Sequence, residues 1–244
     1  MLITFLGTSH GVPAADRYCS CTMIDVGGRL YFIDAGAPLI DILLRRGVDL
    51  SAVKTIFTTH IHGDHVNGLP ALTDLFNWYF KETSVDIYLT EQRGIDAIRG
   101  YLSVVEGPLD EQRLRYHVMT PSTVYDDGVI RVTPFPTRHM GDRPAFSYLV
   151  EAEGKKVMFS GDLSPRLTGD DFPAYTLGSE VDLLVCEMAH FGVSEVTPWL
   201  ERCQAKKVLF NHVFPLDKLD QIRALDGKWG YPIRPVDDGE QIAL

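Results

Sequence analysis

Four side chains that can bind a metal ion lie within six residues of this sequence, at His60, His62, Asp64 and His65. They directly follow the apolar run Thr55–Thr58, which is typical of a buried strand that delivers polar groups at its end. Neutral imidazole nitrogens and carboxylate oxygens bind zinc and similar cations at about 2.0–2.2 Å. The spacing His-x-His-x-Asp-His therefore predicts a metal site.

Three further candidate ligands each follow a run that is typical of a strand. A site for two metal ions needs about seven protein ligands, so the cluster at residues 60–65 supplies only part of one. Because groups at the carboxyl ends of strands meet at one rim of a sheet, we expect these residues to join that cluster. They are His139, Asp162 and His212, after the expected strands Val129–Phe135, Lys156–Ser160 and Lys207–Asn211.

Strands and helices alternate along both halves of the chain, which favours two packed sheets flanked by helices. Gly27-Gly28 predicts a hairpin between the strands Thr22–Val26 and Leu30–Ile33. The other expected elements are strands at Leu2–Leu6, Val53–Phe57, Val85–Leu89, Leu114–Met119, Phe146–Glu151, Val181–Cys186 and one or two after Ile233, and helices at Pro38–Arg46, Pro70–Phe80, Glu91–Val104, Glu195–Cys203 and Leu216–Leu225.

A length of 244 residues with 45% hydrophobic residues is enough for one domain with a large core. The sequence shows neither a linker nor a repeat, so we expect a single domain over residues 1–244. The N-terminus lacks the features of a signal peptide, and no window reaches the ~18 apolar residues of a membrane span. These features predict a cytoplasmic protein with no membrane partner.

The net charge is −10, from 33 acidic and 23 basic residues. Because affinity for nucleic acid rests mainly on neutralising phosphates with Lys and Arg, this charge predicts that nucleic acid is an unlikely partner. A small-molecule substrate is expected instead, and a homodimer is the default expectation for the oligomeric state.

The four cysteines, Cys19, Cys21, Cys186 and Cys203, contain no Cys-x-x-Cys pair. Buried, reduced thiols are the favoured interpretation. An additional structural zinc bound by all four is the alternative.

These residues together resemble the metallo-β-lactamase fold superfamily of hydrolases over nearly the whole chain. The resemblance runs from Phe5–Thr8 and Phe32–Gly36, through the cluster at 60–65, to His139, Ser160-Gly161-Asp162 and His212. It implies an α/β (α+β) fold, a four-layer αββα sandwich of two mixed sheets flanked by helices. It also implies two divalent metal ions per chain, with zinc the default and manganese, iron and cobalt the alternatives.

The resemblance also assigns the ligands by position. His60, His62 and His139 look like ligands of the first ion. Asp64, His65 and His212 look like ligands of the second ion, with Asp162 as the bridging carboxylate.

Within the superfamily, the chain is most similar to the tRNase Z-like phosphodiesterase branch. The residues that carry this similarity are Leu6-Gly7-Thr8 with Pro13 and Arg17, His62–Pro70, Leu183–Glu187 and His190. That branch has a long tRNA-binding insertion before the third motif, whereas the region around Gly107-Pro108 is short here. We therefore expect phosphodiester hydrolysis of a small or cyclic substrate, with tRNA 3′ processing less favoured.

The expected mechanism uses a hydroxide bridging two metal ions, with Asp64 orienting the nucleophile and His190 protonating the leaving group. Asp34 and Glu187 are expected to support the ligands and His190 from a second layer. His10, in the loop after the first strand, could border the pocket. The alternatives are hydrolysis of a carboxylic ester, lactone, thioester or amide at the same site, or a metal-binding module without activity.

Overall fold

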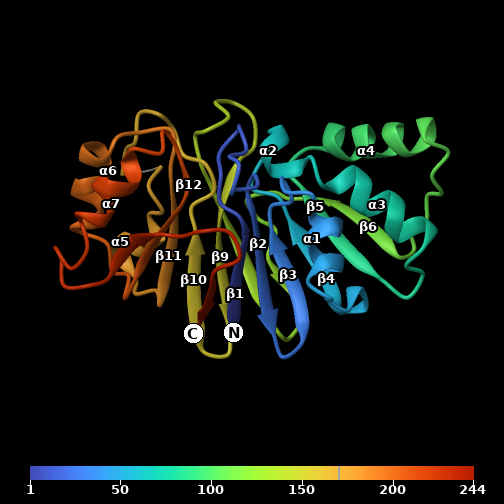
Figure 1. The fold of residues 1–244 in the computed structure, drawn as a ribbon, viewed down its shortest axis with the longest axis horizontal. Coiled ribbons are helices and arrows are strands. Elements are labelled where there is room, and N and C mark those ends of the chain that lie inside the picture. The colour runs from blue at the N-terminus through green and yellow to red at the C-terminus, as the bar shows by residue number, and fades with distance from the viewer. Residues whose placement is uncertain (170) are drawn as a thin grey trace. The chain divides into compact units, whose positions relative to one another are not determined.

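The computed structural model describes residues 1–169 and 171–244. By their internal contacts these residues form two compact units. Unit 1 consists of Met1–Gly7, Gly11–Met119 and Asp238–Ala243, and unit 2 of Thr8–His10, Thr120–Asp237 and Leu244. Each unit contains one seven-stranded mixed sheet (Figure 1).

The sheet of unit 1 has the order β14-β1-β2-β3-β4-β5-β6. The pairs β14–β1, β1–β2 and β2–β3 are antiparallel, and β3 to β6 pair in parallel. Gly27 and Gly28 have φ angles of 59° and 81°, which the tight turn between β2 and β3 requires. The strands are β1 (Leu2–Gly7), β2 (Cys21–Val26), β3 (Arg29–Ile33), β4 (Val53–Phe57), β5 (Val85–Leu89), β6 (Leu114–Val118) and β14 (Gln241–Ala243).

Helices of unit 1 cover one face of this sheet. Alternate residues of the strands, such as Phe32, Ile56 and Ile87, are fully buried and belong to one apolar core with Leu43 and Phe76 from the helices. Figure 1 shows α1, α3 and α4 alongside β3 to β6. The helical segments are α1 (Leu39–Arg45), a 3₁₀ turn (Leu50–Ala52), α2 (Gly63–Val66), α3 (Leu69–Trp78) and α4 (Gln92–Val104).

The sheet of unit 2 has the order β13-β12-β11-β10-β9-β8-β7. Strands β7 to β10 pair antiparallel, and β10 to β13 pair in parallel, so four consecutive strands end on the same side. The elements are β7 (Tyr125–Asp126), β8 (Arg131–Pro136), β9 (Phe146–Ala152), β10 (Lys155–Phe159), β11 (Leu183–Met188), β12 (Val208–Val213), β13 (Ile233–Pro235), α5 (Tyr175–Gly178), α6 (Val193–Leu200) and α7 (Lys218–Arg223).

The core of unit 2 lies between its sheet and its helices. Met158, Leu184 and Phe210 from the parallel strands pack with Val196 of α6 and Ile222 of α7. The apolar runs that predicted these strands are therefore the buried faces of a sheet covered by helices.

The expected strands and long helices are present, with ends that differ by a few residues. The short elements α2, α5 and β7 lack a sequence signal because one turn of helix or one pair of residues shows no period. The tail contributes two edge strands, β13 to the sheet of unit 2 and β14 to that of unit 1. The expectation of a single domain over residues 1–244 stays a prediction. Among the described helices, none has the length and apolar character to span a bilayer.

Candidate metal centre

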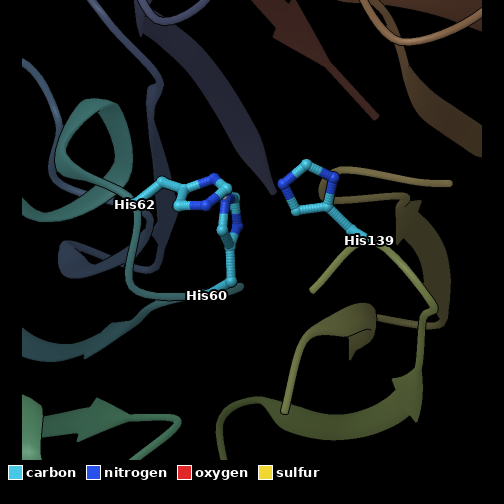
Figure 2. A group of neighbouring side chains, drawn as sticks. All are labelled: His60, His62 and His139. Carbon is cyan, nitrogen blue, oxygen red and sulfur yellow. The ribbon is translucent and has the colours of Figure 1, made fainter. Parts of the chain in front are cut away.

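In unit 1 the end of β4 delivers two histidines that face each other. Nε2 of His60 lies 3.0 Å from Nδ1 of His62, and the two rings meet edge to face with centroids 4.6 Å apart. Figure 2 shows both side chains rising from the segment that follows β4. His60 is fully buried, whereas His62 is exposed.

The one-turn helix α2 places the other two members of the cluster. His62 precedes its first residue, and Asp64 and His65 lie within it. Oδ2 of Asp64 is 3.4 Å from Nε2 of His65, a buried ring. The cluster 60–65 thus presents four donor groups from one strand end and one helical turn.

Asp34, directly after β3, fixes this cluster through hydrogen bonds to His65 and to Thr59. Its Oδ2 lies 2.7 Å from Nδ1 of His65, and its Oδ1 accepts a 2.7 Å hydrogen bond from the backbone nitrogen of Thr59. Since an ionised carboxylate only accepts, Nδ1 of His65 carries the proton and Nε2 keeps its lone pair for a ligand. Asp34 has φ 62°, a left-handed conformation that is costly outside glycine and is typical of functional sites.

Gly36 allows the segment after β3 to approach α2 closely. A Cβ atom at this position would lie 1.6 Å from the carbonyl oxygen of Asp64. The two segments are joined by hydrogen bonds of 2.8 Å from Ala35 N to His65 O and 2.7 Å from Gly68 N to Ala35 O. The glycine is therefore required by packing against the backbone that carries Asp64 and His65.

In unit 2 three histidines surround Asp162, which is buried at the loop after β10. The Nε2 atoms of His212, His139 and His190 lie 3.3, 3.7 and 3.9 Å from Oδ2 of Asp162. His139 follows β8, the loop after β11 carries His190, and His212 belongs to β12. Figure 2 draws His139, whose Nδ1 lies 3.3 Å from the carbonyl oxygen of Leu163. That carbonyl only accepts, so Nε2 is again the nitrogen with a lone pair.

Glu187, near the end of β11, supports both sides of this group. Its Oε1 accepts hydrogen bonds of 2.7 Å from Leu163 N and 2.8 Å from Nδ1 of His190. Its Oε2 accepts from Ala189 N and His190 N at 2.7 and 3.1 Å. The carboxylate is 1% exposed, so it fixes the residue after Asp162 and the ring of His190 from within the core.

Two supporting groups have no signal in the sequence. Asp171, which is buried, accepts hydrogen bonds from the backbone nitrogens of Arg138 and Ser164, each within two residues of a candidate ligand. Nζ of Lys218, on α7, donates to the carbonyl oxygens of Met188, Ala189 and Phe191 at 3.0, 3.2 and 2.7 Å. The contact of Asp171 with Arg138 spans 33 residues and those of Lys218 span 27 to 30, so the tertiary fold brings these segments together.

His212 also has an unusual backbone. Its φ is 51°, and its nitrogen donates a 2.9 Å hydrogen bond to the carbonyl oxygen of Thr8. This bond ties residues 8–10 to unit 2 and brings the ring of His10 to 6.1 Å from that of His212.

The donor sets fit a divalent cation. Two ligand atoms about 2.0–2.2 Å from one ion lie about 3–3.5 Å apart. The pairs His60–His62, Asp64–His65 and Asp162–His212 have separations of 3.0, 3.4 and 3.3 Å. Imidazole and carboxylate groups are the ligands that zinc and similar cations take.

The cysteines are free thiols, as expected; three are buried and Cys19 is half-buried. Burial raises the pKa of the Cys19 thiol, and the charge of Asp64 raises it further. Burial also raises the pKa values of Cys21, Cys186 and Cys203. None of these cysteines belongs to a group of three or more described side chains close enough to hold one ion, so the described residues give no support to a structural zinc.

Comparison with known proteins places the chain in a family. The profile of the family described as anti-Pycsar protein Apyc1 matches residues 1–172. Ribonuclease Z of Prochlorococcus marinus (strain MIT 9303) is 32% identical over 196 residues, which cover 75% of this chain and 59% of that protein. Ribonuclease BN of Cronobacter sakazakii (strain ATCC BAA-894) is 30% identical over 158 residues, covering 64% of this chain and 51% of that protein.

These relatives correct one expectation. Their names state that they are ribonucleases, enzymes that act on RNA. The prediction from net charge that nucleic acid is an unlikely partner is therefore wrong. Total charge failed as a guide because it averages over the surface, whereas a substrate meets only the groups near the site.

Solved structures confirm the fold class, two mixed sheets each flanked by helices. The metallo-β-lactamase fold protein YhfI from Bacillus subtilis aligns with a TM-score of 0.79 at 16% identity, over 99% of both chains. The short form of human tRNase Z, ELAC1, aligns with a TM-score of 0.76 at 21% identity, over 100% of this chain and 99% of that chain. The chain therefore belongs to the anti-Pycsar protein Apyc1 family, in the tRNase Z-like branch of the metallo-β-lactamase fold.

Proposed function

We propose that this protein is a metal-dependent phosphodiesterase. The observation that carries the proposal is the orientation of His190, whose Nδ1 is held 2.8 Å from Glu187 and whose Nε2 lies 3.9 Å from Oδ2 of Asp162. An imidazole fixed in this way beside a candidate ligand can give a proton to a departing alkoxide. Phosphodiester hydrolysis needs such a group because alkoxides are poor leaving groups.

The ligand assignment by position is part of this proposal. His60, His62 and His139 would hold the first ion, and Asp64, His65 and His212 the second. Asp162 would bridge the two. Bound divalent ions, zinc by default, supply an activated water and neutralise charge on the phosphoryl oxygens.

The chain's own residues orient the ligands and supply the proton for the leaving group. Asp34 keeps the proton on Nδ1 of His65. Glu187 keeps the proton on Nδ1 of His190 and fixes the backbone after Asp162. Nε2 of His190 holds the proton that the leaving oxygen takes, a step worth about 10²–10⁴ in rate.

Two substrate classes compete. The segment around Gly107-Pro108 is short, whereas the tRNase Z-like branch has a long tRNA-binding insertion there. This difference favours a small or cyclic phosphodiester. RNA, with tRNA 3′ processing as the reaction, fits the names of the ribonuclease Z and ribonuclease BN relatives. This chain spans only 59% and 51% of those two proteins, so their activity is one candidate for this chain.

The test uses protein of measured metal content on bis-p-nitrophenyl phosphate, a nitrophenyl carboxylic ester and a β-lactam. Hydrolysis of the diester alone, abolished by a chelator and by Asp162→Ala, is expected. Activity only on the carboxylic ester or the β-lactam would contradict a phosphodiesterase. A tRNA precursor with a 3′ trailer and a nucleoside cyclic phosphate, tested in parallel, separate the two substrate classes.

A further inference from the structure

Two aromatic rings stack at the end of β12 in unit 2. The ring centroids of His10 and Phe214 lie 3.8 Å apart, and the ring planes differ by 10°. The two residues are more than 200 positions apart in the sequence, so the pair exists only in the fold.

Phe214 offers an open ring surface. Its side chain is 46% exposed although His10 covers one face of the ring. The exposed area therefore belongs to the other face and the edge. Single exposed apolar side chains are common on protein surfaces, so the position of this ring carries more weight than its exposure.

This stacked pair is anchored to the candidate metal centre. His10 also contacts His212 edge to face, with centroids 6.1 Å apart, and Nε2 of His212 lies 3.3 Å from Oδ2 of Asp162. Backbone bonds from His212 to Thr8 and from Phe214 to Met188, at 2.9 and 3.4 Å, hold both segments in place. Phe214 is thus held two residues after His212, a candidate ligand of the second metal ion, and shares the ring of His10 with it.

We propose that Phe214, backed by His10, is a stacking surface for the nucleobase of the substrate. The proposal rests on the phosphodiesterase function and names its substrate class, a phosphodiester of a nucleoside. A base stacks on an aromatic ring through its flat face, which every base offers, so the surface favours nucleosides without selecting one base. Phe214 is then a specificity-determining residue, and His10 positions its ring.

The test compares two chromogenic diesters with the same leaving group. Thymidine 5′-p-nitrophenyl phosphate carries a nucleoside, and methyl p-nitrophenyl phosphate carries none. The measured quantity is the ratio of their kcat/KM values. We expect Phe214→Ala to lower this ratio about tenfold, the loss typical of one stacked base, and Phe214→Trp to keep it.

Leu216→Ala is the matched control, since Leu216 is 44% exposed, two residues further on. It should leave the ratio unchanged. Phe214→Leu, which keeps the apolar bulk and removes the aromatic ring, should lower the ratio as the alanine variant does. Should Phe214→Ala or Phe214→Leu reduce both kcat/KM values equally, the stacking surface is refuted and the phosphodiesterase stands. If the metal-loaded wild type hydrolysed neither diester, the phosphodiesterase function itself would be refuted.

Discussion

Oε1 of Glu187 lies 2.8 Å from Nδ1 of His190, and both oxygens of this buried carboxylate accept further bonds from the backbone around them. The pair is therefore preorganised: the ring cannot turn without breaking a charge-assisted hydrogen bond inside the core. This geometry supports the proposed role of His190 as an acid that Glu187 orients.

Replacing His190 should separate substrates by their leaving group. In His190→Ala, hydrolysis of a diester with an alkoxide leaving group should fall about 10²–10⁴-fold, whereas p-nitrophenolate release should fall far less because that anion leaves without a proton. Steady-state rates on both substrates at equal metal content measure this. An equal loss on both would show that His190 is not the acid.

Replacing Glu187 should resemble the loss of His190 and also weaken the fold. In Glu187→Gln one oxygen becomes an amide nitrogen, which cannot accept, so either Leu163 N or the pair Ala189 N and His190 N loses its partner, at a cost of about 1–3 kcal/mol. Urea unfolding and rates on the alkoxide substrate check this. Glu195→Gln, at the start of α6, is the control, since its carboxylate bonds only Gly192 N among the contacts described. Wild-type rates in Glu187→Gln would remove the orienting role.

Asp34→Asn should weaken metal binding without distorting β3. Asparagine tolerates the φ of 62° at this position, so the change removes mainly the charge that faces His65. Loss of a carboxylate behind a ligand histidine lowers metal affinity about 10–100-fold. Competition with a chromogenic chelator measures this, with the exposed Asp41→Asn as control. Unchanged affinity would leave Asp34 a purely structural residue.

Two kinds of apolar pattern mark the strands: β5 (Val85–Leu89) alternates buried and half-buried residues, whereas β11 (Leu183–Met188) is a continuous buried run. The first clue to most of the candidate ligands was a position shortly after such a run, although His212 lies within β12 and Asp64 and His65 lie in α2. Their assignment to metal ions stays a prediction.

Supporting residues could not be predicted in the same way. Lys218 contacts a loop 27 to 30 residues before it, and His10 reaches Phe214 across nearly the whole chain. Neither contact leaves a local pattern, because each depends on how β12 and its neighbours pair. The sequence likewise gives no indication that His212 has a left-handed φ.

Lys218→Met should slow the step that depends on His190. The ammonium group donates to three carbonyl oxygens of the loop that carries His190, and its burial lowers the pKa of Lys218. Without these bonds the loop loses its fixed position, so kcat on the alkoxide substrate should fall severalfold while KM changes little. Lys218→Arg should restore part of the rate, and the exposed Lys228→Met should have no effect. A change confined to KM would contradict a positioning role.

Asp86, on the face of the unit 1 sheet away from the helices, should make the stability of the fold depend on pH. Burial raises the pKa of this carboxyl, but hydrogen bonds of 2.6 Å from Nη2 of Arg115 and 2.7 Å from Nε2 of His117 outweigh it, so the pKa lies below the ordinary value of 3.8. The unfolded chain therefore binds more protons than the folded chain in the interval below 3.8. The stabilisation by Asp86 is complete above the ordinary pKa and is lost as the pH falls through the folded value.

Asp86→Asn tests this sign. The wild type should exceed the variant in free energy of unfolding at about pH 5, and the difference should shrink as the pH is lowered toward about pH 2. Urea unfolding at a series of pH values, on metal-free protein so that ligand protonation does not enter, measures the difference. Asp41→Asn, an exposed carboxylate on α1, is the control for loss of one charge. A difference that is independent of pH would mean that Asp86 contributes through packing, and one that grows on acidification would reverse the predicted direction of its pKa shift.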